Sequence, residues 1–149
     1  VSVDERLITA QNPSSTTASA IAMVKAMGIE VKPVKVYNED ATLDLVAAFL
    51  KGDDIALSKL ADKSLGYQLP LVAMYGYYFS NFAEGVHANQ QALDLMLVAQ
   101  EALNNPRLDL QIAKSQRVLG KIDAAKLTLK KVLEATPDNK DAKEMLATL

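Results

Sequence analysis

Hydrophobic residues recur with a helical period over most of this sequence. From Asp40 onward, apolar positions are spaced three or four residues apart, which is the spacing of one face of an α-helix. The interruptions between these stretches contain glycine, asparagine or proline, the residues that most often end helices. The pattern predicts helices over 40–50, 55–65, 70–82, 92–103, 108–119, 123–135 and 138–149.

The interruptions are themselves periodic, at intervals of roughly 34 residues. Three glycines each separate the two helices of a pair, and three prolines each separate one pair from the next: Gly52, Gly85, Gly120, Pro70, Pro106 and Pro137. One helical pair cannot bury its apolar face alone, so successive pairs stack and share a core. We therefore expect a mainly all-α fold in which residues 41–149 form stacked helical hairpins that build an α-α superhelix.

The first 40 residues have a different pattern. Residues 7–9 favour a β-strand, and a loop rich in turn and cap residues leads to an apolar helix over 18–27. A strand needs a partner, so this strand–loop–helix arm, 1–28, must pair outside the chain or lie against the rest of it. Residues 29–40 alternate around a proline and predict a linker, with Asn38 and Asp40 as candidate caps of the next helix.

Composition removes several classes of function. The net charge is -2, which argues against nucleic acid as a main partner because phosphate binding needs clustered cations. No apolar run approaches the ~20 residues that span a bilayer, so we expect no membrane partner. The sequence has no cysteine, which excludes disulfides and cysteine nucleophiles in this chain and fits a cytoplasmic protein.

Few residues suggest chemistry. His87 is the only histidine, and without a cysteine or a serine nucleophile nearby it forms no triad, so we expect a loop or helix-start residue. The paired acids Glu39-Asp40 and Asp53-Asp54 stand where helices begin, where carboxylates cap free N–H groups. We therefore predict no catalytic residue, no metal site and no cofactor in this chain.

The last third of the chain adds a family resemblance. It reads G-K-I-D-A-A-K-L-T-L-K-K-V-L-E-A-T-P from Gly120, and residues 107–140 resemble a tetratricopeptide repeat. Ala113 and Ala125 stand at the small positions where the two helices cross, but Gln116 stands where an aromatic residue is usual. The resemblance implies a helical scaffold that binds a protein or peptide, or a second copy of itself.

In a tetratricopeptide array the first helix of each pair lines the concave groove. Applied to this sequence, the resemblance places three cations in the groove, which together would hold the carboxylate of a peptide. The alternative is a solvated face on which cations only maintain solubility. The groove positions are Arg107, Leu110, Lys114, Arg117 and Val118 in the last pair, with Tyr77, Ser80 and Asn81 in the middle pair.

Most aromatic residues of the chain lie close together between positions 75 and 82. A helix cannot point all of them in one direction. We expect Tyr75, Tyr78, Phe79 and Phe82 to share the packed face. Tyr77 then points elsewhere, into a groove or onto another chain, unless it too packs against a neighbouring helix.

The arm has a resemblance of its own. The run L-I-T-A-Q-N-P-S-S and the alanine-rich helix after it resemble the final strand, loop and helix of the ThiJ/PfpI superfamily. This implies that Gln11, Asn12 and Pro13 form the rim of a pocket whose cysteine nucleophile lies upstream. The chain would then be the C-terminal fragment of a ThiJ/PfpI-like protein with a non-catalytic interaction or oligomerisation module.

Two alternatives remain for the arm. It belongs to a cysteine-dependent hydrolase, amidase or glyoxalase-like enzyme whose catalytic residues lie upstream, or it is an unrelated strand–loop–helix.

Overall fold

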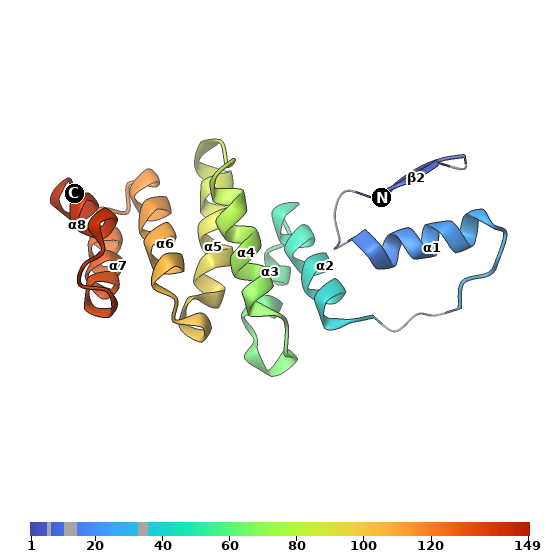
Figure 1. Ribbon diagram of the computed structural model, residues 1–149, viewed down its shortest axis with the longest axis horizontal. Helices are drawn as coiled ribbons and strands as arrows, with labels where there is room; N and C mark the ends of the chain where they lie inside the picture. Colours follow the sequence, from blue (N-terminus) through green and yellow to red (C-terminus); the bar gives the residue numbers. More distant parts are fainter. Residues whose placement is uncertain (6, 11–14, 33–35) are drawn as a thin grey trace.

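The computed structural model describes residues 1–5, 7–10, 15–32 and 36–149. Figure 1 shows an elongated row of helices that runs from the N-terminal arm at one end to α8 at the other. The only strands in the described part form one short two-stranded sheet. The expectation of a mainly all-α fold is confirmed.

All of the helices predicted after residue 40 are present. After the linker the order is α2 (Asn38–Leu50), α3 (Asp54–Ala61), the short 3-10 helix η2 (Lys63–Leu65), α4 (Leu69–Ser80), α5 (Gly85–Leu103), α6 (Pro106–Val118), α7 (Ile122–Ala135) and α8 (Lys140–Ala147). The largest difference from the prediction is the start of α5, which begins at Gly85 rather than near residue 92. Its first turns contain a single large apolar residue, Val86, which is exposed, so apolar periodicity does not detect them. The amide of Asn89 donates to the carbonyl of Gly85 at 2.8 Å and holds this extra segment.

The N-terminal arm contains a hairpin followed by a helix. Strand β1 (Ser2–Asp4) pairs antiparallel with β2 (Leu7–Thr9), and Val3 lies opposite Ile8. The strand predicted at residues 7–9 is confirmed, and its partner is the N-terminal segment of the same chain. Helix α1 (Thr16–Ala26) follows, and Met23 in this helix and Met27 at its C-cap are exposed.

The predicted caps of α2 are wrong. Tyr37 occupies the N-cap position, and no side chain there accepts a capping bond. The side-chain amide of Asn38 instead donates to the carbonyl of Gly66 at 2.8 Å. Asp40 accepts a hydrogen bond from the hydroxyl of Thr17 at 3.0 Å, which joins the arm to α2. Both polar side chains therefore bind to distant segments, which sequence spacing alone does not reveal.

The helices pack as consecutive pairs. The most extensive contacts join α4 with α5, α6 with α7, and α2 with α3. Between pairs, α2 contacts α4 and α4 contacts α6, while α3 contacts α5. The first helices of the pairs therefore follow one another along one side of the row.

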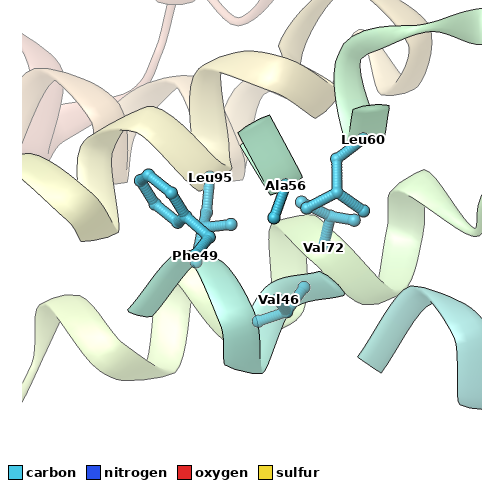
Figure 2. Packing of buried hydrophobic residues seen from close by; sticks show 6 residues of the cluster. All are labelled: Val46, Phe49, Ala56, Leu60, Val72 and Leu95. Atoms are coloured by element: carbon cyan, nitrogen blue, oxygen red, sulfur yellow. The ribbon is translucent and has the colours of Figure 1, made fainter. Parts of the chain in front are cut away.

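The hydrophobic core is shared between successive pairs. Figure 2 shows the first cluster, to which α2, α3, α4 and α5 all contribute: Val46, Phe49, Ala56, Leu60, Val72 and Leu95. A second cluster joins α4 and α5 to α6, and a third joins α6 and α7 to α8. Because every cluster includes helices from beyond one pair, no pair buries its apolar side chains alone.

Buried polar side chains reinforce these packing contacts. The hydroxyl of Thr42 donates to the carbonyl of Asn38 at 2.6 Å and accepts from the backbone N–H of Gln68, at the start of α4. The amide of Gln91 donates to the carbonyl of Phe49 at 3.0 Å, at the end of α2. The bonds to the N–H of Gln68 and to the carbonyl of Phe49 satisfy groups at helix ends that have no partner within their own helix.

One buried carboxylate links three helices. Asp109 in α6 accepts a hydrogen bond from the amide of Gln100 in α5 at 2.9 Å. Its other oxygen lies 3.4 Å from the ammonium of Lys131 in α7. A buried charge needs such partners because desolvation penalises it strongly. Asp109 therefore fixes the position of the last pair relative to α5.

Candidate protein-binding face

Helix α4 lies between α2 and α6 and has an unusual surface. The sequence from Leu69 to Ala83 contains no charged residue. The buried side of α4 consists of Val72, Ala73 and Gly76, which face the neighbouring helices. An exposed helix side normally carries charge, so this uncharged outer side needs a separate explanation.

The buried side of α4 consists of small residues because α5 crosses it closely. A Cβ atom placed on Gly76 would lie 2.9 Å from the backbone oxygen of Ala92 and equally close to side-chain atoms of Leu95 and Met96. No larger residue fits at this crossing without movement of the backbone. The large side chains of α4 are therefore directed to its flanks and outer side.

The prediction that four aromatic residues share the packed face of this helix is wrong for two of them. Tyr78 and Phe82 do not share the packed face, since they are 60% and 79% exposed. Tyr75 and Phe79 are half-buried. Tyr77 is 39% exposed, and its ring contacts that of Tyr78 edge to face at a centroid distance of 5.7 Å. Small residues occupy the helix crossing where the prediction had placed aromatic ones.

Two pockets flank the outer side of α4. The pocket toward α6 has a volume of about 430 Å³, and the pocket toward α2 has a volume of about 260 Å³. Pro70 and Met74 line both pockets, so they form a ridge between them. The α6-side pocket is completed by Ala73, Tyr77, Leu103, Asn105, Arg107 and Leu108, and the α2-side pocket by Glu39, Gln68 and Leu71. We call the ridge and its two pockets the α4 face.

The α4 face has one charge of each sign. Arg107 is the only charged residue that lines the α6-side pocket, and Glu39 is the only one that lines the α2-side pocket. Both side chains are exposed, and neither forms an ion pair with another residue in the described part of the chain. The face therefore consists of an apolar centre with an acid on one side and a base on the other.

The structure separates the three predicted groove cations. Arg107 lines the α6-side pocket together with Tyr77. Lys114 and Arg117 line a different pocket of about 300 Å³, between α6 and α8, whose wall also includes the acids Asp141 and Glu144. These acids offset the two cations. Of the other predicted groove positions in α6, Leu110 packs against the third core cluster and Val118 is exposed.

Ser80 and Asn81 lie beside Tyr77 at the end of α4. The hydroxyl of Ser80 donates to the carbonyl of Tyr77 at 2.7 Å and accepts from the amide of Gln111 in α6 at 2.8 Å. The amide of Asn81 donates to the same carbonyl at 3.0 Å. Both side chains therefore stabilise the last turn of α4, and Ser80 also fixes it against α6.

Sequence analysis identified Tyr77 and Arg107 but missed Pro70, Met74 and Glu39 as parts of a common surface. A signal was present in the sequence. Pro70, Met74 and Tyr77 follow helical spacing on an uncharged helix, beside the stripe that contains Val72 and Gly76. A helix with two adjacent apolar stripes buries one in the core and exposes the other.

His87 and Asp53, which were considered for catalysis or metal binding, lie where helices begin. His87 is exposed in the first turn of α5. The carboxylate of Asp53 accepts from the N–H of Ile55 at 3.0 Å, which confirms its predicted role as a helix cap. Within the described ranges, no group of three or more His, Cys, Asp or Glu residues is placed to hold a metal ion. The predicted pocket rim, Gln11, Asn12 and Pro13, lies outside the described residues.

Comparison with known proteins does not assign the chain to a family. No protein-family model, curated protein or solved structure matches the chain. Among the helices that the structure describes, none is long and apolar enough to cross a membrane.

Proposed function

We propose that this chain is a protein-binding module that holds its partner on the α4 face. The observation that supports this function best is the outer side of α4, where Met74 and Tyr77 are 41% and 39% exposed on a helix without charge. Centres of protein interfaces are depleted of charged residues and enriched in tyrosine and methionine. The two pockets on either side of the ridge would receive side chains of the partner.

The α4 face is also preorganised for binding. Its residues come from four packed helices, α2, α4, α5 and α6, and the close crossing at Gly76 holds α4 against α5. Binding to a rigid surface loses less conformational entropy than binding to a mobile loop. Rigid placement of Met74 and Tyr77 therefore supports a docking function over a purely structural one.

We propose further that residues 41–149 act as a tetratricopeptide-like scaffold, attached to the C-terminal part of a ThiJ/PfpI-like domain at 1–28. Support for the scaffold comes from the paired order of α2 to α7 and from Ala113 and Ala125, which are fully buried. Support for the domain at 1–28 is limited to the order of β2 and α1. In this proposal the chain binds and performs no chemistry.

The binding function is tested with a displayed library of short peptides selected against the whole chain. The selected peptides are then titrated into wild type, Met74→Lys and Tyr77→Lys, with binding followed by calorimetry. A charge at either position would be desolvated in the complex, so we expect at least about tenfold weaker binding. Circular dichroism of each variant verifies that its helices are intact.

Leu127→Lys is the matched control, because Leu127 is an exposed apolar residue on α7, away from the α4 face. It introduces the same charge and should leave the affinity unchanged. The proposed function is wrong if the selected peptides bind Met74→Lys and Tyr77→Lys as tightly as they bind wild type.

A further inference from the structure

The two charges of the α4 face lie on opposite sides of its ridge. Glu39 is in the first turn of α2, and Arg107 is in the first turn of α6. Figure 1 shows α2 and α6 on opposite sides of α4, and all three helices begin at the lower edge of the view. Pro70, in the first turn of α4, lines both the pocket that contains Glu39 and the pocket that contains Arg107, so the acid and the base lie on either side of it.

We infer that the partner is a second copy of this chain, bound face to face through α4 about a two-fold axis near Pro70 and Met74. This inference rests on the proposed binding function. A two-fold axis places the same surface of both copies in contact. When this axis runs along the ridge, parallel to α4, it also exchanges the two sides of the ridge, so that Glu39 of each copy lies opposite Arg107 of the other.

The charge pattern favours a second copy over a partner whose surface is only acidic or only basic. A partner with an acidic surface would pair with Arg107 and leave Glu39 desolvated and unpaired, and a basic partner would do the reverse. An unpaired charge at an interface opposes binding strongly. A second copy provides one acid and one base in the reversed order, so both charges of both copies are paired.

The apolar centre fits the same arrangement. Pro70 and Met74 line both pockets and therefore form the centre of the face. An axis along these two residues lies over the part of the face that has no charge. Each ridge would then lie against the ridge of the other copy, with the α2-side pocket of one copy facing the α6-side pocket of the other. Burial of this uncharged surface provides the association energy, and the two charge pairs fix its register.

The decisive experiment is charge reversal measured by analytical ultracentrifugation of the whole chain. We expect wild type to form more dimer as its concentration rises. Glu39→Arg and Arg107→Glu should each raise the dimer dissociation constant at least tenfold, because each brings like charges together. The double variant Glu39→Arg/Arg107→Glu should regain the wild-type dimer. Lys130→Glu, which reverses an exposed charge on α7, is the control and should not change the dimer.

Mixing the two single variants adds a test that is specific for the two-fold geometry. In a heterodimer of Glu39→Arg with Arg107→Glu, both opposed pairs again join an acid to a base. Native mass spectrometry of an equimolar mixture should therefore show the heterodimer well above either homodimer. A statistical mixture of the three species would overturn the inferred arrangement.

The absence of cysteine permits an independent test. Met74→Cys introduces a single thiol beside the proposed axis. Oxidation by oxygen with copper phenanthroline should join two copies through a disulfide, and Leu127→Cys should remain mostly without a cross-link under the same conditions. Equal cross-linking of both variants would contradict contact at the ridge.

The outcomes separate this inference from the function on which it rests. A wild-type chain that stays monomeric at every concentration, or a dimer that the charge reversals leave unchanged, overturns the second-copy inference. If the peptides from the library still need Met74 and Tyr77, the proposed function stands without it. If neither the dimer nor the peptides depend on the α4 face, both proposals fail.

Discussion

Gly76 of α4 lies directly against the backbone carbonyl of Ala92 in α5, where an added Cβ atom would be 2.9 Å from the carbonyl oxygen. Such a Cβ would also lie 2.9 Å from side-chain atoms of Leu95 and Met96. The two helices of the central pair therefore cross at a point that only glycine fits. This contact explains why the larger side chains of α4 are directed to its flanks and outer side.

Gly76→Ala is expected to destabilise the protein despite the better helix propensity of alanine. The propensity gain is about 1 kcal/mol in a helix interior. Overpacking at a tight contact costs about 1–3 kcal/mol, and here one contact atom belongs to the backbone and cannot rotate away. We expect the free energy of unfolding to fall by up to about 2 kcal/mol, measured by urea denaturation.

Leu127→Ala serves as the control for Gly76→Ala, because it changes an exposed apolar side chain on α7, away from both this crossing and the α4 face. Its stability should stay within about 0.5 kcal/mol of wild type. An increase in stability for Gly76→Ala would show that α4 and α5 are farther apart than the structure places them.

Most of the helices follow from the sequence because their signals are local. Gly52 and Gly120 adopt positive φ values of 102° and 70°, and each lies between the two helices of a pair, as predicted. The breaks before α4 and α6 were found from Pro70 and Pro106, which stand in the first turns of those helices. Such breaks depend on the backbone preferences of single residues, so sequence alone reveals them.

The α4 face could be predicted only in part because it depends on contacts between distant segments. Tyr77 and Arg107 were identified from their positions in a presumed groove. The exposure of Tyr78, however, follows from how closely α5 approaches Gly76. Likewise, the contribution of Glu39 depends on α2 packing beside α4, which local spacing does not determine.

The last pair depends on another small residue, which is buried in its core. Ala125 in α7 is fully buried. Ala125→Arg would place a charge where it has neither room nor a partner, which costs about 3 kcal/mol or more. We expect hydrogen exchange to show loss of protection in α6, α7 and α8 while α4 stays protected. Leu127→Arg introduces the same side chain at an exposed site on α7 and should leave the hydrogen-exchange protection unchanged. Unchanged protection of α6, α7 and α8 in Ala125→Arg would contradict this packing.

Asp62 provides a prediction about pH. The hydroxyl of Ser64 donates to its carboxylate at 2.6 Å and the N–H of Ser64 at 2.9 Å, and these bonds lower the pKa of Asp62 below its ordinary value. A lowered pKa in the folded state stabilises the fold above the unfolded pKa, and this contribution is lost as the pH falls through the folded pKa. An NMR titration should show the pKa of Asp62 rise in Ser64→Ala, since the larger of the two contributions is removed. An unchanged pKa would mean that the hydroxyl bond does not form in solution.

The contact between Gln116 and Thr128 tests how α6 and α7 are joined. Gln116 lies in α6 and Thr128 lies in α7. The side-chain oxygen of Gln116 accepts a hydrogen bond from the hydroxyl of Thr128 at 2.9 Å, and both side chains are buried. Thr128→Val keeps the shape of the side chain but leaves this oxygen without its donor. We expect the variant to lose about 1–3 kcal/mol of unfolding free energy, because an unpaired buried group retains its desolvation penalty.

The double variant Gln116→Met/Thr128→Val removes both polar groups and should be much less destabilised than the two single variants together. Replacing both partners of a buried hydrogen bond by apolar groups of similar shape is often nearly neutral. A double-mutant cycle from urea denaturation should therefore give a coupling energy of about 0.5–3 kcal/mol. If the two single effects simply add, Gln116 and Thr128 do not interact in solution. In that case, apolar packing alone joins α6 to α7 at this position.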